Sequence, residues 1–290
     1  MIVVVVYGGL GNQLFQYAAG RALALKKGCE LKLDISAFEN YSPHNGFELG
    51  LFNIDAQIAN PDEISSLVGT QFRLSRLILR KLRLGKKTHI IERSFEFDQN
   101  FFNIKPPVLL EGYWQSYKYF NGYDTQIRSE LMFRNPPIAK NLETAELIAK
   151  ENSVSIHIRR GDYVTNQIAN KVHGALGISY YKNAIQRIYD EVDSPHFFVF
   201  SDDLAWARNN LGLSVSVTFV AHNTGKSSFE DMRLMSLCKY NIIANSTFSW
   251  WGAWLNKNSG KIVIYPRNWF NDSGINTQDL TPETWVAIDG

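Results

Sequence analysis

The chain has 290 residues, of which 45% are hydrophobic and 20% are charged, and its formal net charge is +2. This balance is typical of a globular protein and provides no global field that would attract nucleic acid. The length favours two domains of ordinary size. Any anion-binding site must therefore come from a local cluster of basic residues.

The two cysteines, Cys29 and Cys238, lie far apart in the chain and are expected to be reduced thiols. The apolar start "MIVVVVYGG" lacks a basic n-region and a cleavage site, and its apolar run is too short for a signal peptide. No stretch reaches the roughly 18 apolar residues of a membrane span. The sequence predicts a cytoplasmic protein, with contact to the inner membrane face as a further possibility.

The N-terminal third begins with the β-branched run "IVVVVYGG", which predicts a central parallel strand. "NQLFQYAAGRALALKKG" follows with helical spacing of its apolar residues and ends at Gly28, a residue suited to a C-terminal cap. "ELKLDIS" then predicts a second strand. The resulting βαβ unit indicates a parallel sheet with helices on its faces.

A basic segment follows at residues 73–87. It places apolar residues on one helical face and cations on the other. The cations are Arg73, Arg76, Arg80, Arg83 and Lys87. This pattern fits a solvated surface helix, and it also fits a helix that rests on an anionic membrane or a lipid-linked glycan.

A second series of strands alternates with helices from residue 153 onward and predicts a second α/β unit. Pro136 and Pro137 interrupt the pattern between the two series. We therefore expect an N-terminal domain over residues 1–135 and a C-terminal domain over residues 145–290. Two α/β domains facing each other across a cleft is the predicted fold.

Polar residues follow three strands of the second series, where ligands bind in a parallel sheet. They are His157, Arg159, Arg160 and Asp162 after the first strand, Ser201, Asp202 and Asp203 after the second, and Asn245, Ser246, Thr247 and Ser249 after the third. A guanidinium fork with hydroxyls and loop amides suits a diphosphate. If the strand extends that far, alternation puts only Arg159 on the side of His157.

The adjacent acids Asp202 and Asp203 suit a different part of a nucleotide. Their oxygens could accept hydrogen bonds from the N–H groups of a base such as guanine, or from a ribose diol. A purely structural alternative pairs Arg160 with Asp162 inside the protein. Both interpretations stay open at this stage.

The turn "GGLGNQ" lies between a strand and a helix. Gly9 and Gly11 match a dinucleotide fingerprint whose third glycine is replaced by Leu14, and Asp34 stands where a ribose-binding acid would be. An NAD-type oxidoreductase is therefore one possibility. The glycines could instead let backbone amides and Asn12 approach an anionic group or a sugar, or could form only a tight turn.

The sequence gives no metal-binding signature. It lacks Asp-x-Asp, Cys-x-x-Cys and closely spaced histidines, and Asp202–Asp203 is the single Asp–Asp pair, which could hold Mg²⁺. Arginine must then neutralise a leaving diphosphate. We predict no metal and no cofactor.

Six motifs together resemble the bacterial-type α-1,2-fucosyltransferases of glycosyltransferase family eleven. They are "GGLGNQLFQYAAGRALA", "GYWQSYKYF", "HIRRGDYV", "FSDD", "NIIANSTFSWWGAWLN" and "PRNWF…DLTPETW", and they extend over nearly the whole chain. The resemblance implies two Rossmann-like domains without metal, GDP-fucose as donor and inversion at the anomeric carbon. It implies no nucleic-acid partner.

The resemblance also implies roles for single residues. Arg159 would bind the β-phosphate and His157 would contact the nucleotide. Asp202 or Asp203 would bind guanine, and Ser249, with Ser246 and Thr247 beside it, would reach the phosphate. Gly9, Gly11 and Asn12 would lie near the sugar.

The general base is not fixed by any motif. Asp162, His173, His44 and Glu48 are candidates, since an inverting transfer needs at most one group to take the acceptor proton. Tyr113 and Trp114 could stack on a galactose. Trp250, Trp251 and Trp254 are expected to be core residues.

The sequence thus predicts fucose transfer from GDP-fucose to O2 of a terminal β-galactoside. Another GDP-fucose-dependent linkage is the alternative within the class. An NAD-type oxidoreductase and a non-catalytic carbohydrate-binding module are the alternatives outside it.

Overall fold

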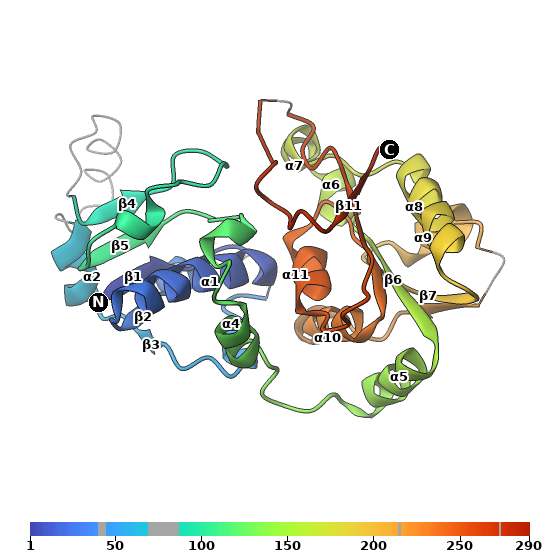
Figure 1. Cartoon of the computed structure of the whole chain (residues 1–290), viewed down its shortest axis with the longest axis horizontal. Helices are drawn as coiled ribbons and strands as arrows, with labels where there is room; N and C mark the ends of the chain where they lie inside the picture. The colour runs from blue at the N-terminus through green and yellow to red at the C-terminus, as the bar shows by residue number, and fades with distance from the viewer. Residues whose placement is uncertain (40–44, 69–86, 214–215, 273) are drawn as a thin grey trace. The chain divides into compact units, whose positions relative to one another are not determined.

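The computed structural model describes residues 1–39, 45–68, 87–213, 216–272 and 274–290 (Figure 1). The chain forms two compact units, Met1–Arg134 with Thr277–Thr281 and Asn135–Asn276 with Pro282–Gly290. His44 and all of the basic segment except Lys87 lie outside the described residues. The predicted contact of this segment with a membrane stays a prediction.

The N-terminal unit is a parallel sheet with helices between its strands, as the sequence predicted. Its elements are β1 (Ile2–Val5), α1 (Leu10–Lys27), β2 (Leu31–Asp34), β3 (Gln57–Ile58), α2 (Pro61–Val68), β4 (His89–Ile91), β5 (Val108–Glu111) and α4 (Asp124–Glu130), with short 3-10 turns at Ser36–Phe38, Leu49–Leu51, Phe101–Asn103 and Tyr117–Tyr119. The strand order is β3-β2-β1-β5-β4. The chain moves outward from β1 through β2 and β3, and then returns to pair β5 with the other side of β1.

Helix α1 packs closely on this sheet because its apolar residues recur at helical spacing. Leu14, Phe15 and Ala18 are completely buried. Gly20 allows the closest approach, since a Cβ there would lie 2.2 Å from Val4 Cγ2. The helix ends at Gly28, whose φ of 59° is the left-handed C-cap that the sequence predicted.

The C-terminal unit is a six-stranded parallel sheet. Its elements are α5 (Ala139–Lys150), β6 (Asn152–Ile158), α6 (Gly161–Thr165), α7 (Gln167–Val172), α8 (Ile178–Glu191), β7 (Pro195–Ser201), α9 (Leu204–Asn210), β8 (Val217–Val220), α10 (Phe229–Leu237), β9 (Tyr240–Ile242), α11 (Thr247–Leu255), β10 (Val263–Pro266) and β11 (Val286–Ile288), with a 3-10 turn at Gly225–Ser227. The order β11-β10-β9-β6-β7-β8 is that of a dinucleotide-binding sheet.

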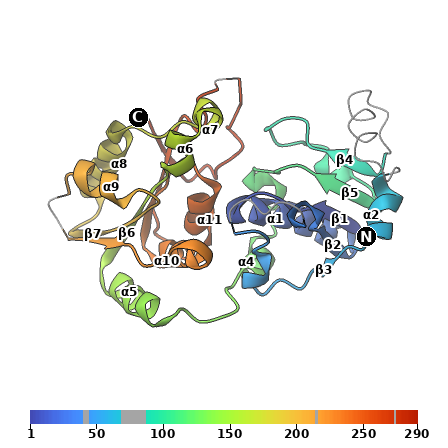
Figure 2. The same cartoon turned by 180° about the vertical axis from the view of Figure 1, so that it is seen from behind.

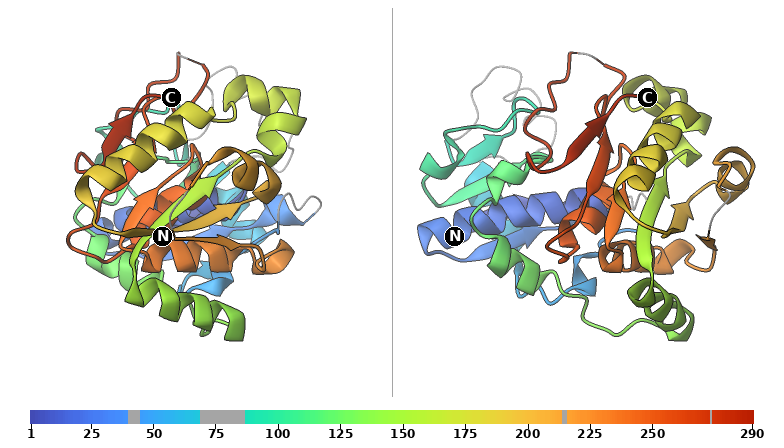
Figure 3. Two further views of the ribbon diagram at one scale, coloured as in Figure 1. Left: turned by 90° about the vertical axis from the view of Figure 1, so that its right-hand side faces the viewer. Right: turned by 45° about the vertical axis from the view of Figure 1, so that its right-hand side comes forward.

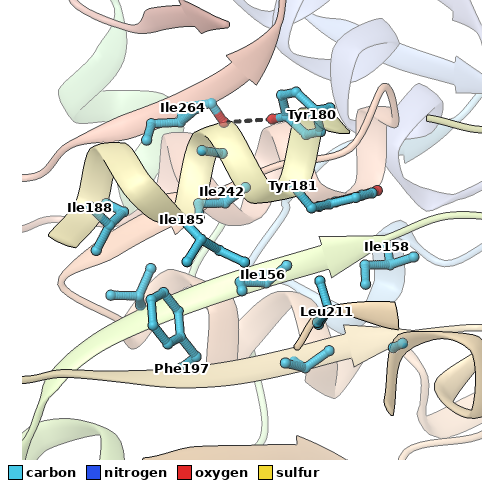
Figure 4. Close-up of a cluster of buried hydrophobic side chains, with 14 of the residues drawn as sticks. Ile156, Ile158, Tyr180, Tyr181, Ile185, Ile188, Phe197, Leu211, Ile242 and Ile264 are labelled. Carbon is cyan, nitrogen blue, oxygen red and sulfur yellow. Dashed lines mark hydrogen bonds between the residues drawn. The ribbon is translucent and has the colours of Figure 1, made fainter. Parts of the chain in front are cut away.

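Helices cover both faces of this sheet (Figure 2). Tyr180, Ile185 and Ile188 of α8 pack on Ile156 and Phe197 of the central strands (Figure 4). Helices α5, α10 and α11 form a layer through their mutual contacts, with α5 also packed on β6. The apolar strands are buried on both faces, which explains why they read as nearly continuous hydrophobic runs.

The tryptophans of α11 are core residues, as predicted. Trp250 and Trp251 are completely buried, and Trp254 is 3% exposed. Trp250 and Trp251 pack edge to face with ring centroids 5.1 Å apart. These three residues therefore hold the helix in place and are not available to a sugar.

The C-terminal segment contributes to both units. Strand β11 pairs with β10 in the C-terminal sheet, as Figure 3 shows in red beside orange-red. Before it, Thr277–Thr281 belongs to the N-terminal unit, where Asp279 forms an ion pair with Lys118 and accepts a hydrogen bond from the Phe97 N–H. Two motifs about 160 residues apart in sequence thus meet, since the Asp279 carbonyl also accepts from Ser116 Oγ. No pattern in the sequence predicts this return.

Within the part of the chain that the structure describes, no helix is both long and apolar enough to cross a bilayer.

Candidate active site

The C-terminal sheet reverses its direction of growth between β6 and β9. Successive strands extend from β6 through β7 to β8, and then from β9 through β10 to β11 on the other side. The loops after β6 and β9 consequently diverge and leave room at the carboxyl edge. The sequence motifs "HIRRGD" and "NSTFS" are the segments that follow these two strands.

The two adjacent arginines make different ion pairs. Arg159 Nη1 lies 3.0 Å from Asp202 Oδ2, and Arg160 Nε lies 3.2 Å from Asp203 Oδ2. The guanidinium of Arg160 also stacks over Trp206, 4.1 Å from the ring centroid. Arg160 is therefore held within the protein by Asp203. The side chain of Asp162, which the structural alternative named, lies outside the described residues.

The carboxylate of Asp202 also fixes the backbone of the arginine loop. Its Oδ1 accepts a hydrogen bond of 2.8 Å from the Arg160 N–H. Gly161 is needed at this point, because a Cβ there would lie 2.8 Å from Asp202 Oδ2. Strand β6 ends at Ile158, so strand alternation does not decide which way the arginines point. The two acids decide it instead.

The two acids are thus already engaged by arginine and backbone groups. Asp203 also caps α9, since its Oδ1 accepts from the Trp206 N–H at 3.0 Å. A guanine would have to share these carboxylates with the arginines. Among the residues that the structure describes, no group of three or more acid, histidine or cysteine side chains could hold a metal ion.

His157 is buried at the end of β6, with 7% of its surface exposed. Its ring lies 5.8 Å from that of Phe248 in the first turn of α11. Burial, and secondarily the charge of Arg159, lower the pKa of His157 to about 3. The imidazole is therefore neutral at physiological pH. Its Nδ1 has no hydrogen-bond partner within the described parts of the chain.

The hydroxyl residues of "NSTFS" begin helix α11. Ser246 is the N-cap and accepts from the Phe248 N–H at 3.3 Å. Thr247 is the first helical residue. Ser249 is completely buried, and its hydroxyl lies 3.3 Å from the Ser246 carbonyl, to which it donates. The hydroxyls of Ser246 and Ser249 thus both already make hydrogen bonds in the first turn of the helix.

Asn245, which sequence analysis placed among the strand-end residues without a role, organises this edge. Its Nδ2 donates to the carbonyls of His173 and Trp269, at 2.9 and 3.2 Å. It thereby holds the His173 loop against the end of β9. The His173 ring stacks on Tyr163 with centroids 4.9 Å apart, and the Tyr163 hydroxyl donates to the Asn245 carbonyl.

The C-terminal unit therefore brings most of the predicted residues to one edge of one sheet. Asp202 pairs with Arg159, and His157 lies beside Phe248 of the helix that Ser246 caps. His173 stacks on Tyr163, which donates to the carbonyl of the residue before Ser246. Asp162 lies in the short helix α6 directly after the arginine loop.

The N-terminal sheet reverses at β1 and β5, and two further motifs follow these strands. In "GGLGN", Gly8 has a φ of 80°, Gly9 is the N-cap of α1 and Gly11 is buried in its first turn. The conformation that requires glycine is thus at Gly8, which the fingerprint comparison had not singled out. Asn12 Oδ1 accepts from Gln115 Nε2 of "GYWQS" at 2.9 Å.

Two buried glutamines that sequence analysis missed fasten this edge. Gln16 accepts from the Tyr7 N–H and donates to the Gly112 carbonyl, at 3.1 and 3.2 Å. Gln13 donates to the Gly8 and Gly46 carbonyls and accepts from the Glu48 N–H at 2.9 Å. Their polar character inside the apolar face of α1 was the available signal.

Glu48 and Asp34 differ in what surrounds them. Burial raises the pKa of Glu48, which is 8% exposed, so its carboxyl holds a proton more readily than usual. Asp34 is 3% exposed and accepts from the Ser36 N–H at 3.0 Å. The acid expected to bind a ribose in an NAD site is instead the cap of a turn.

The fold defines a class: two Rossmann-like α/β units are the architecture of GT-B glycosyltransferases. The chain belongs to glycosyl transferase family 11, and the model of this family matches residues 1–289. The protein is thus a glycosyltransferase, and the predicted fold class and family are confirmed. Membership of this family is incompatible with the oxidoreductase alternative.

The relatives agree with this assignment. The chain is 38% identical to an alpha-1,2-colitosyltransferase of Escherichia coli over 100% of this chain and 99% of the relative. It is 25% identical to the galactoside 2-alpha-L-fucosyltransferase Sec1 of Mus musculus, over 99% and 74% of the two chains.

Solved structures share the fold at low sequence identity. The alpha-1,6-fucosyltransferase NodZ, soaked with GDP-fucose, has a TM-score of 0.50 at 14% identity, over 88% of this chain and 92% of that chain. FUT1 of Arabidopsis thaliana, in complex with GDP, has a TM-score of 0.50 at 15% identity, over 92% and 71%.

Proposed function

We propose that this protein transfers fucose from GDP-fucose to O2 of a terminal β-galactoside, with inversion and without a metal ion. The observation that carries the proposal is the switch point of the C-terminal sheet, where Arg159 pairs with Asp202 and the neutral His157 lies beside the first turn of α11. A guanidinium and the N–H groups of a helix N-terminus are both suited to a diphosphate. The names of the relatives support an α-1,2 linkage.

In the proposed reaction the acceptor O2 attacks C1 of the donor sugar from the face opposite to the nucleotide. The bond between C1 and the β-phosphate oxygen breaks, and its electron pair leaves with GDP. Arg159 stabilises the negative charge that develops on that oxygen. Asp202 holds the guanidinium in position for this task through its 3.0 Å ion pair.

The acceptor proton must go to a base. Glu48, whose pKa is raised by burial, and His173, which stacks on Tyr163, are the described candidates with a defined side chain. Asp162 and His44 stay candidates from the sequence. A loose, oxocarbenium-like transition state would lower the demand on this base.

The test is to incubate the protein with GDP-fucose and a panel of β-galactosides and to determine the new linkage by NMR. Transfer to O2 with inverted configuration at C1 is expected. Another linkage would correct the regiochemistry. Failure of calorimetry to detect GDP binding, or binding without transfer to any glycan, would overturn the proposal and leave a different donor or a binding module.

A further inference from the structure

The turn "GYWQS" after β5 presents one aromatic side chain and buries the next. Tyr113 is 41% exposed, whereas Trp114 is 2% exposed. Trp114 packs against Phe101 and Tyr119, with centroids 5.3 and 5.4 Å away. The two residues were equal candidates for sugar stacking from the sequence, and only Tyr113 has a face that a ligand could reach.

The position of Tyr113 is fixed by Glu92, the residue that follows β4. One oxygen of the Glu92 carboxylate accepts from the Tyr113 N–H at 2.7 Å, and the other accepts from the Trp114 N–H at 3.0 Å. Gly112 must lack a side chain, because a Cβ there would lie 2.4 Å from Glu92 Cβ. Trp114 adopts a φ of 55°, a conformation that is costly for a non-glycine residue.

Two hydrogen bonds, a required glycine and a positive φ therefore all fix the backbone of a turn that exposes a single aromatic ring. Backbone strain that the surroundings hold in place is concentrated at binding sites. Packing of Trp114 alone would not need both oxygens of a carboxylate, whose pKa is raised by its burial.

Tyr7, which lies just after β1, contributes a second aromatic ring beside Tyr113. Its ring meets that of Tyr113 edge to face, with centroids 5.0 Å apart and an interplanar angle of 61°. Its backbone N–H is held by the buried Gln16. The Asn12–Gln115 amide pair belongs to the same two loops. An aromatic corner next to amide groups thus stands at the switch point of the N-terminal sheet.

We infer that Tyr113, supported by Tyr7, is the platform on which the acceptor sugar packs, and that this corner is a subsite for a neutral hexose. A β-galactoside has one face of C–H groups and a rim of hydroxyls, which match an aromatic ring beside amides. The inference depends on the proposed function for the identity of the sugar. Glu92 acts as a positioning residue, because it holds the backbone that presents the ring.

The experiment compares Tyr113→Ala and Tyr113→Phe with the wild type in steady-state transfer to a β-galactoside. The alanine variant should raise the acceptor KM by ~10-fold or more, with the donor KM unchanged. The phenylalanine variant should stay within about twofold of the wild type, because the ring and not the hydroxyl makes the contact. Met132→Ala, which removes another exposed apolar side chain of this unit, is the matched control.

An acceptor KM within about twofold of wild type for Tyr113→Ala would overturn the subsite while leaving the proposed function intact. If the wild type transfers to no galactoside, the proposed function fails, and saturation-transfer NMR with methyl β-galactoside then tests the subsite directly. Loss of the signal in Tyr113→Ala but not in Tyr113→Phe supports it. Equal signals, or none with the wild type, refute it.

Discussion

The strand order reverses in both sheets, but the side chains that lie at the two reversals differ in charge and polarity. The C-terminal reversal carries two arginines, each paired with an aspartate. The N-terminal reversal is fastened by the uncharged side chains of Gln13, Gln16 and the Asn12–Gln115 pair, with the aromatic corner beside them. Charge stands where an anionic donor is expected, and amides and rings stand where a neutral acceptor is expected. One backbone arrangement can thus serve either ligand, and the side chains of its loops select which.

The largest effect should come from removing the charge of the C-terminal edge. Arg159→Ala should lower kcat/KM by an amount equivalent to a loss of about 3 to 5 kcal/mol in transition-state stabilisation, because the diphosphate is left without its counter-charge. Arg159→Lys should recover only part of this loss, since an ammonium cannot bind two oxygens as a planar fork does. Steady-state kinetics with varied donor measure both. Arg267→Ala, at an exposed ion pair with Asp289, is the control and should stay close to the wild type. Near-normal turnover of the lysine variant would remove Arg159 from the phosphate site.

The neutral state of His157 should affect how the free energy of unfolding depends on pH, rather than the activity. The pKa of His157 in the folded protein is about 3, below its value of about 6.5 in an unfolded chain. Between these values the unfolded state binds the extra proton, so stability is fully present above pH of about 6.5 and falls as the pH decreases toward 3. The slope contributed by this residue approaches ~1.4 kcal/mol per pH unit.

Denaturant unfolding of the wild type and of His157→Gln, measured from pH 7 to pH 4, isolates this contribution. The difference between the two free energies of unfolding should shift steadily in favour of the variant as the pH falls. Parallel curves would mean that His157 becomes protonated in the folded state and can act as a cation beside the donor.

The hydrogen bonds that buried amide side chains make at the N-terminal edge should contribute a smaller amount to stability and to acceptor binding. Gln16→Leu removes the acceptor of the Tyr7 N–H and the donor to the Gly112 carbonyl, and leaves both backbone groups without these bonds. We expect a loss of about 2 kcal/mol in the free energy of unfolding. We also expect a larger increase in acceptor KM than in donor KM, since both tethered loops carry the aromatic corner. Equal increases in the two KM values would argue against separate roles for the two edges.

The smallest effect should come from removing divalent metals. Activity in excess EDTA should remain within about twofold of that with Mg²⁺, because arginine supplies the positive charge that a Lewis acid would otherwise provide. Abolition of turnover by EDTA and its restoration by Mn²⁺ would require Asp202 and Asp203 to leave their arginines and act as ligands.

The sequence by itself determined the class of the molecule. Glycine turns, β-branched runs and helical spacing predicted two parallel α/β units, because these patterns depend on local sterics and on burial along one element. It also placed the polar residues at strand ends, and it identified the tryptophans of α11 as core. These features follow from positions that are near one another in the chain.

Only the tertiary structure decided what those residues do to each other. Which acid pairs with Arg160, whether Tyr113 or Trp114 is exposed, and the return of Asp279 to the N-terminal unit all depend on segments from about 20 to 160 residues apart. Periodicity contains no information about such distant pairs. They are set by strand order, which places the loops after β6 and β7, or after β1, β4 and β5, side by side at one edge.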